Sequence, residues 1–361
     1  MTSPHWDTSA GFFVAIIWRM TRRDWFRFGH VAIWGYTAVL PLIGAGTANG
    51  LATGWQVAGL LATAVAYHLF AYLLNDLVDL PLDKTQPSRQ DYPLVSGRVT
   101  VRQVRVWVAV QLPILLLLWW MLGADGLSLL SLAWAVSGMT LYNLYGKRSP
   151  LPPLTDLVQG SSWAAFLLFG ALVVGQPTPQ SWMAAGFIIV YILLVNGINS
   201  SLRDLANDYA FGARTTAIWL GARPFPPDQF TIPIRLRLYA FFWQTVLILL
   251  GSILPVIDKF PLSRSEQLPW WLELILRILS IQCYVLLWQI TRKKSPMRDM
   301  AIVLMGHNIC MLFMLFTAVL PLTNPLIRWA IILAFTLPLL TSDWLAEKWV
   351  HSRLTQLPTE R

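Results

Sequence analysis

Ten long apolar segments constrain what this chain of 361 residues can fold into more than any other feature. A helix needs about 20 mostly apolar residues to cross the hydrocarbon core of a bilayer. Only 12% of the residues are charged and 56% are hydrophobic, whereas an ordinary soluble domain carries roughly 25% charged residues. The composition excludes an ordinary cytosolic enzyme, a disordered protein and a DNA-binding domain. It indicates a polytopic membrane protein whose surface mostly faces lipid.

We expect residues 1–361 to form one domain, because no low-complexity linker divides the chain. Two of the apolar segments are short, so the prediction is nine or ten transmembrane helices. The apolar stretch at residues 12–17 is too short to span a membrane and is followed by arginines, which fits an amphipathic helix lying in the membrane plane. The predicted spans are residues 28–47, 55–77, 106–122, 127–144, 157–174, 182–202, 238–257, 270–290, 301–320 and 329–344.

The positive charges gather on one side of these predicted spans. If both termini are cytoplasmic, the cytoplasmic segments hold 23 of the 27 Lys and Arg residues. This is the positive-inside pattern of multi-pass membrane proteins. The net charge of +9 is therefore mostly a consequence of membrane orientation, and we expect no nucleic-acid partner. The chain is predicted to be an integral, multi-pass membrane protein with both termini on the cytoplasmic side.

Two groups of polar and acidic residues follow even-numbered spans, both at the cytoplasmic side. Residues four apart lie on the same face of a helix, so members of each group are expected to lie one above the other. Pro81 is expected to end or kink the second helix near residue 80, so that Asp83 would reach the site from a turn. The two groups are Asn75, Asp79 and Asp83 after the second span, and Asp204 and Asp208 after the sixth.

These five residues offer only oxygen ligands, with no His or Cys among them. Such ligands suit a hard cation, Mg²⁺ above all, which proteins hold through a few carboxylates together with substrate phosphates. One acidic pair alone would more simply be a solvated helix end, but two pairs at equivalent places favour a site. The same side of the membrane carries bases that suit phosphate oxygens, so the pattern indicates a diphosphate site. These bases are Lys84, Arg89, Arg98, Lys147, Arg203 and Arg214, with Arg22 and Arg23 near the N-terminus.

The two groups resemble the two motifs of the UbiA superfamily of intramembrane prenyltransferases. NDLVDLPLD at residues 75–83, followed by PLVSG at 93–97, resembles the first motif. DLAND at 204–208, followed by GART at 212–215 and LG at 220–221, resembles the second. Tyr142 to Lys147 lie where the family carries a Tyr and a Lys after its fourth helix, and Arg22 lies where many members have an Arg before the first span. The likeness covers roughly residues 20–223, whereas 235–361 match by hydropathy alone and are predicted to add transmembrane helices.

The resemblance implies an all-α, polytopic membrane helical bundle around a central cavity with a cytoplasmic cap. It also implies that a prenyl diphosphate binds through two Mg²⁺ ions, one held by Asn75, Asp79 and Asp83 and the other by Asp204 and Asp208. Catalysis is expected to depend on Asp79, Asp204 and Lys147. The substrate-binding candidates are Arg22, Lys147 and Arg203, with Tyr142 or Tyr145 nearby. The chain departs from the family in the spacing of residues 142–147 and in a tenth span beyond the usual nine.

The predicted function is Mg²⁺-dependent transfer of a prenyl group from a prenyl diphosphate to a lipophilic, typically aromatic, acceptor within the lipid membrane. Excluding water protects the allylic carbocation formed when the donor ionises. A UbiA-type terpene cyclase, which ionises the same diphosphate without an acceptor, stays open as an alternative. A transporter is disfavoured, because its acids should lie near the bilayer midplane. Aromatic side chains that could stabilise the cation are Tyr67, Phe70, Tyr72, Trp163, Phe166 and Tyr191.

Overall fold

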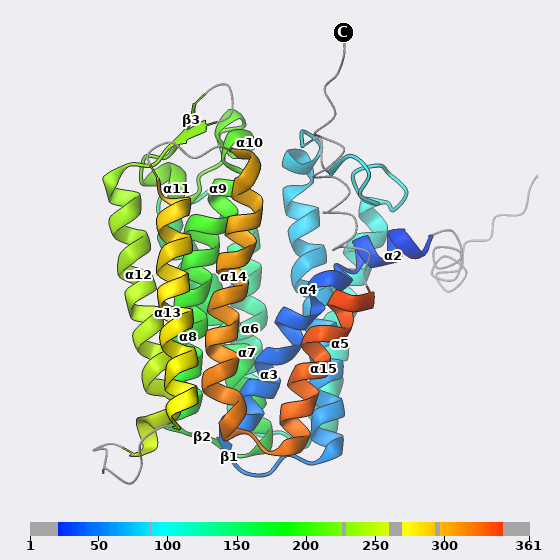
Figure 1. Ribbon diagram of the computed structural model, residues 1–361. Coiled ribbons are helices and arrows are strands. Elements are labelled where there is room, and N and C mark those ends of the chain that lie inside the picture. Colours follow the sequence, from blue (N-terminus) through cyan, green and yellow to red (C-terminus); the bar gives the residue numbers. More distant parts are fainter. Residues whose placement is uncertain (1–20, 87–88, 226–228, 260–268, 293–296, 342–361) are drawn as a thin grey trace, which may run out of the picture.

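The computed structural model describes residues 21–86, 89–225, 229–259, 269–292 and 297–341, and these residues form a bundle of long helices (Figure 1). The strands within these ranges are two short antiparallel pairs, which confirms the predicted all-α membrane bundle. The strands are β1 (Ala48–Asn49), paired with β2 (Gln176–Pro177), and β3 (Arg223–Phe225), paired with β4 (Gln229–Thr231).

Within the described residues, eight helices are long and apolar enough to cross a membrane. Two shorter apolar helices, residues Val31–Thr47 and Pro325–Thr341, coincide with the first and tenth predicted spans. The short segment at residues 12–17 and the end of the tenth span, residues 342–344, lie outside the described residues. The principal helices are α3 (Trp34–Thr47), α4 (Gly54–Asp83), α5 (Val101–Met121), α6 (Gly126–Tyr145), α7 (Pro152–Val174), α8 (Pro179–Leu194), α12 (Ile234–Ile253), α13 (Trp270–Ile290), α14 (Met297–Val319) and α15 (Pro325–Thr341).

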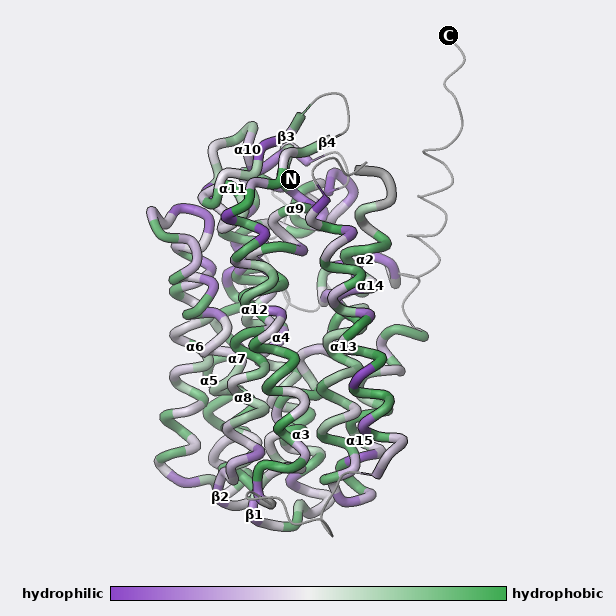
Figure 2. Tube along the Cα trace, turned by 60° about the vertical axis from the view of Figure 1, so that its left-hand side comes forward, coloured by the Kyte–Doolittle hydropathy of each residue, from purple (hydrophilic) through white to green (hydrophobic). Residues whose placement is uncertain are grey.

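Shorter elements connect these helices, and several of them gather at one end of the bundle (Figure 1). Figure 2 shows hydrophobic residues along most of the length of the long helices and hydrophilic residues at the end that carries α9, α10 and α11. The shorter elements are α2 (Arg22–Phe28), η1 (Val31–Ile33), the π-helix η3 (Val195–Ser200), α9 (Ser201–Arg203), α10 (Leu205–Ala210), α11 (Thr216–Trp219), η4 (Leu254–Lys259) and η6 (Leu320–Leu322).

Helices α3 and α7 approach each other closely because a glycine lies on each side of their contact. A Cβ atom at Gly44 would overlap the backbone oxygen of Leu167, and one at Gly170 would overlap the backbone oxygen of Pro41. Small residues at such contacts allow backbones to pack together within a membrane. This contact joins the first long helix of the bundle to its middle.

Pro81 does not end helix α4, which continues to Asp83. The expectation that Asp83 would reach the site from a turn is therefore wrong. Proline removes one backbone N–H donor, but the helical hydrogen bonds resume beyond it, since the Lys84 N–H donates to the Leu80 oxygen at 3.1 Å. The long buried length of α4 keeps its last turn helical despite the missing donor.

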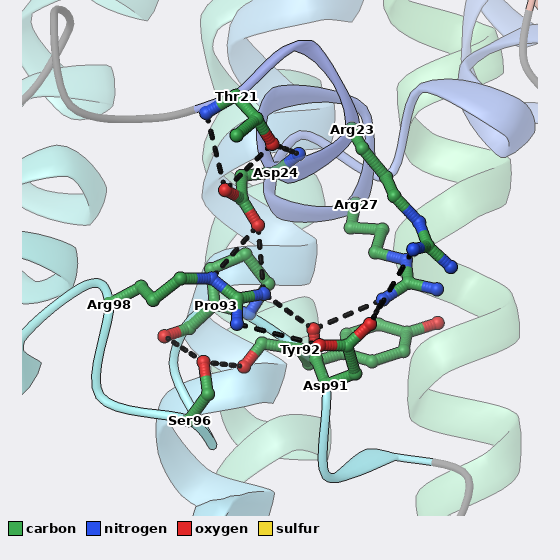
Figure 3. Close-up of polar contacts among 9 residues, drawn as sticks. All are labelled: Thr21, Arg23, Asp24, Arg27, Asp91, Tyr92, Pro93, Ser96 and Arg98. Atoms are coloured by element: carbon green, nitrogen blue, oxygen red, sulfur yellow. Dashed lines mark hydrogen bonds and ion pairs between the residues drawn. The ribbon is translucent and has the colours of Figure 1, made fainter.

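The segment after α4 is fastened to α2 by charged side chains (Figure 3). Arg98 lies 2.8 Å from the Asp24 carboxylate and donates to the backbone oxygen of Asp91 at 2.7 Å. Arg27 lies 2.6 Å from the Asp91 carboxylate, and Arg23 lies 3.8 Å from it. These contacts join α2 to residues 91–98, so the N-terminal helix and the segment after the first motif form one cap.

Candidate active site

The first motif lies on the last three turns of α4. The Asn75 amide donates to Asp79 Oδ2 at 3.4 Å and to Asn143 Oδ1 of α6 at 3.3 Å. Its side-chain carbonyl oxygen is the atom that remains for a cation. Asp83 is buried, and Arg89 Nε lies 3.9 Å from its carboxylate. The helical spacing therefore places Asn75 and Asp79 one above the other on α4, as predicted, and Asp83 follows one turn later on the same helix.

The second motif lies where the sixth span loses its regular helical form. The π-helix η3 is followed by three residues of α9, and the helix is interrupted at Asp204, whose φ and ψ are −100° and 7°. The backbone N–H of Asp208 still donates to the Asp204 oxygen at 2.9 Å. Arg203 holds the Asp204 carboxylate with two hydrogen bonds, from Nε at 3.0 Å and from Nη2 at 2.7 Å. Asp208 is buried, and its Oδ1 accepts no hydrogen bond from the described residues.

Lys147 lies between the two motifs. Its Nζ is 2.9 Å from Asp79 Oδ2 and 4.0 Å from Asp208 Oδ1. The residue follows α6 directly, and its backbone oxygen accepts a hydrogen bond of 2.8 Å from the Arg214 N–H. Three segments that are distant in sequence therefore converge on one ammonium group.

Burial and neighbouring charges shift the pKa values of the site residues in opposite directions. Burial would lower the pKa of Lys147, but the carboxylates of Asp79 and Asp208 outweigh it and raise that pKa above its usual value. Burial raises the pKa of Asp208 to about 6, although Lys147 opposes the shift. For Asp204, burial would raise the pKa, but the bonds from Arg203 outweigh it and the pKa lies below its usual value. The positive charges of Lys147 and Arg203 therefore oppose the effect of burial on Asp208 and Asp204, and they outweigh it only at Asp204.

A pocket opens beside Lys147 and the second motif, and Tyr142 forms part of its lining. Of the other predicted substrate-binding residues, Tyr145 is 56% exposed and does not line it. Arg203 is paired with Asp204 and does not line the pocket either. Arg22 is the first residue of α2, and its side chain lies outside the described part of the structure. The lining residues that matter for the chemistry are Tyr142, Lys147, Asp156, Asn196, Asp204, Asp208, Arg214 and Thr216.

The five predicted metal ligands lie in the two separate acidic motifs and do not form a single cluster. Within the described ranges, no group of three or more His, Cys, Asp or Glu side chains lies close enough together to hold a metal. The donor set nevertheless fits Mg²⁺, because it offers only oxygens and because Asp208 Oδ1 is buried and accepts no hydrogen bond from the described residues. A buried carboxylate oxygen without a hydrogen bond favours a bound cation in addition to the Lys147 ammonium group 4.0 Å away.

Asp156 is a site residue that the sequence analysis did not identify. It lies near the start of α7, is buried and lines the pocket. Its carboxylate accepts a hydrogen bond from the Thr216 hydroxyl. An acid directly before the fifth predicted span was the available signal, because ionisable groups at membrane spans are costly and usually functional.

The aromatic candidates separate into two groups. Tyr67 is fully buried, its hydroxyl donates to the Ala135 backbone oxygen at 2.9 Å, and its ring stacks on Phe166 at 4.3 Å. Both residues therefore pack the core. Tyr72 is only partly buried, and its ring lies 5.1 Å from the His30 ring and 4.4 Å from the His68 ring.

The fold and the site define an intramembrane protein that gathers carboxylates and bases at one end of a helical bundle. The chain belongs to the UbiA prenyltransferase family, whose model matches residues 32–308. This finding confirms the resemblance seen in the two motifs. The match extends beyond residue 235, where hydropathy alone had suggested a relationship.

Known proteins with similar sequences or structures agree with this membership. A digeranylgeranylglyceryl phosphate synthase from Thermococcus kodakarensis is 27% identical over 175 residues, and the match spans 45% of this chain and 58% of that protein. A solved structure from work on a digeranylgeranylglyceryl phosphate synthase has a TM-score of 0.60 at 16% identity, covering 83% of this chain and 97% of that one. A UbiA homologue from Archaeoglobus fulgidus, bound to GPP and Mg²⁺, has a TM-score of 0.58 at 13% identity, covering 82% and 98%. At such identities the structures show that the fold is shared.

Proposed function

We propose that this protein transfers a prenyl group from a prenyl diphosphate to a lipophilic acceptor within the membrane, in a Mg²⁺-dependent reaction at its cytoplasmic face. The observation that carries the proposal is the position of Lys147 between Asp79 and Asp208, at 2.9 Å and 4.0 Å. The Lys147 ammonium group lies between the two acidic motifs, where the proposed Mg²⁺ ions and the phosphate oxygens of the donor would bind. The Archaeoglobus homologue bound to GPP and Mg²⁺ and another of its structures bound to DMAPP and Mg²⁺ support a prenyl diphosphate as the donor.

We propose that the two acidic motifs bind the metal ions. Asn75, Asp79 and Asp83 would hold one Mg²⁺ ion, and Asp204 and Asp208 would hold the second. When bound, Mg²⁺ neutralises the charge that develops on a diphosphate leaving group. Lys147 binds the diphosphate oxygens directly, and Arg214, which lines the same pocket, adds a second positive charge.

The rest of the bundle protects the ionised donor. The donor's allylic C–O bond breaks, and the diphosphate leaves with the electron pair. The carbocation that remains reacts rapidly with water, so the site has to be dry. We expect the buried apolar side chains next to the last turns of α4 and α6 to keep water away from the isoprenoid chain of the donor. The acceptor then forms a new bond to the cation and loses a proton.

The experiment supplies purified protein with labelled C10, C15 and C20 prenyl diphosphates and Mg²⁺, with and without aromatic acceptors. We expect diphosphate release and a prenylated acceptor, both abolished by a chelator and restored by Mg²⁺. A cyclic hydrocarbon or alcohol formed without acceptor would indicate that the protein is a cyclase and not a transferase. Turnover that is unchanged by the chelator would contradict the assigned metal site.

A further inference from the structure

A buried cluster of polar side chains lies between three membrane-spanning segments. His307 of α14 and Gln244 of α12 are fully buried, and Asn199 of the π-helix η3 is 2% exposed. Helix α8, which η3 continues, packs against both α12 and α14 (Figure 1). Polar groups within membrane spans are costly unless they bind one another, and they usually have a function.

His307 joins the other two residues through its two ring nitrogens. Nε2 lies 2.8 Å from Gln244 Oε1, which can only accept a hydrogen bond, so Nε2 carries the proton. Nδ1 then accepts a hydrogen bond from Asn199 Nδ2 at 3.2 Å. The same amide group of Asn199 also donates to Asn308 Oδ1 of α14. Helix α14 therefore holds η3 by the side chain of Asn199.

The cluster leaves one buried donor unused, so it is not arranged for stability alone. Gln244 Nε2 has no hydrogen-bond partner among the described residues. An unpaired buried donor costs free energy that an apolar side chain of similar size would avoid. What the arrangement does provide is a fixed position for the His307 ring and, through it, for Asn199.

The π-helix η3 differs from the helix before it by its wider turn. A π-helix closes its hydrogen bonds between residues five apart, so a single turn takes up one residue more than an α-helical turn, and such turns are frequent at functional sites. Each residue of an α-helix turns by about 100° around the axis. Relaxation of η3 to a regular α-helix would therefore rotate the segment beyond it by about that angle relative to α8.

The second acidic motif begins directly beyond η3. The Asp204 N–H donates to the Ser200 oxygen at 3.1 Å, and the Asp208 N–H donates to the Asp204 oxygen at 2.9 Å. These backbone bonds transmit a rotation of η3 to both carboxylates. In the observed arrangement Asp208 Oδ1 lies 4.0 Å from Lys147 Nζ. The rotation would turn the two carboxylates away from Lys147 and from the first motif.

From these observations we infer that His307 is a positioning residue for the second acidic motif, because its hydrogen bond with Asn199 keeps η3 in the π form and so directs Asp204 and Asp208 to the metal site. The inference rests on the proposed Mg²⁺-dependent function and assigns a part in it to the helices beyond residue 235. Loss of the bond weakens Mg²⁺ binding although every proposed ligand is retained.

Two substitutions of His307 separate this bond from the general stability of the cluster. The side-chain amide of asparagine ends at the position of Nδ1, so His307→Asn keeps the bond to Asn199 and loses the bond to Gln244. The amide of glutamine reaches the position of Nε2, so His307→Gln keeps the bond to Gln244 and loses the bond to Asn199. Each variant thus keeps one of the two polar contacts and breaks the other.

Ser181→Ala is the matched control at the opposite end of the same span. Ser181 is fully buried, and its hydroxyl donates to the Thr47 backbone oxygen at 2.9 Å. The substitution removes a buried hydrogen bond between helices that has no connection to η3. The unfolding temperature in detergent is measured for every variant, so that a loss of stability is separated from a loss of position.

Two measurements on the purified full chain report the position of the motif. The first is amide hydrogen exchange of residues 195–208 without metal. The second is the Mg²⁺ concentration that gives half-maximal diphosphate release from labelled prenyl diphosphates.

In His307→Gln we expect exchange to be faster by about fivefold or more, since a hydrogen bond that holds the segment is lost. Its Mg²⁺ requirement should rise about 10–100-fold, the usual effect of losing a residue that orients a metal ligand. His307→Asn and Ser181→Ala should stay close to wild type in both measurements. Asn199→Ala breaks the same bond from the side of η3, so it should reproduce the result of His307→Gln and replaces that variant if it does not fold.

The outcomes separate this inference from the proposed function. Wild-type protein that releases no diphosphate from any donor would overturn the proposed function, whereas faster exchange in His307→Gln would still support the hold of His307 on η3. Equal exchange in the two His307 variants, or an equal Mg²⁺ requirement, would overturn the inference alone. A Mg²⁺ requirement raised as much in Ser181→Ala would do the same.

Discussion

The ammonium group of Lys147 lies 2.9 Å from the carboxylate of Asp79 although the two residues are 68 positions apart in the sequence. Lys147 also approaches Asp208 at 4.0 Å, so one side chain joins both acidic motifs. In the absence of bound cations, Lys147 offsets the repulsion between the two carboxylates. This relationship is the basis of the first two predictions.

Removing the charge from either acidic motif should abolish turnover. Asp79→Asn and Asp204→Asn each remove a proposed metal ligand while preserving side-chain volume, and we expect at least a 100-fold loss of Mg²⁺-dependent diphosphate release. Asp125→Asn is the matched control. Asp125 caps the first turn of α6 through Ser128, and Asn is an equally good cap. Full turnover by both site variants would remove the site assignment.

Lys147→Met should weaken donor binding. The substitution removes the cation that we place against the diphosphate, so the donor KM should rise by at least tenfold. Lys147→Arg should retain part of the affinity, because the charge remains. Arg148→Met serves as the control, since Arg148 is the exposed neighbour of Lys147. Titration of donor concentration at saturating Mg²⁺ measures the effect, and equal KM values for the Lys147 and Arg148 variants would contradict it.

The close contact of α3 with α7 should not tolerate a methyl group. Gly44→Ala and Gly170→Ala each place a Cβ against a backbone oxygen, so the helices would have to separate. We expect about 1–3 kcal/mol of destabilisation, or more if the helices cannot adjust. The apparent unfolding temperature in detergent reports it. Gly126→Ala is the control, because nothing lies within 4 Å of its added Cβ. Unfolding temperatures that do not distinguish the three variants would argue against the contact.

Acid should weaken the contact between α2 and residues 91–98. Burial would raise the pKa of Asp24, but hydrogen bonds from Thr21 and Arg98 outweigh it, and the pKa lies below its usual value. Because the pKa is lower in the folded state, the stabilising contribution is complete above the unfolded value of about 3.9 and is lost as pH falls through the folded value. Hydrogen exchange of residues 22–28, relative to intrinsic rates, should therefore speed up below about pH 4 in the wild type. Asp24→Asn should show the faster exchange already at pH 7.

The acidic motifs were predictable because their geometry is local. Asn75 and Asp79 share a helix face through their spacing alone, and the structure keeps them in contact at 3.4 Å. Pro81 is the exception within this motif. A proline disfavours a helix only by a few kcal/mol, and the packing of a 30-residue helix exceeds that local preference.

The sequence by itself determined the membrane bundle, its nine or ten predicted spans and the positions of the two acidic groups along the chain, because hydropathy and helical periodicity act over one or two turns. Only the tertiary structure decided which groups meet in space. The contacts of Lys147 with Asp79 and Asp208, of Thr216 with Asp156 and of His30 with Asp76 all join segments that are distant in the sequence. Their distances depend on how α3, α4, α6 and α7 pack. The periodicity of residues within one segment does not predict that packing.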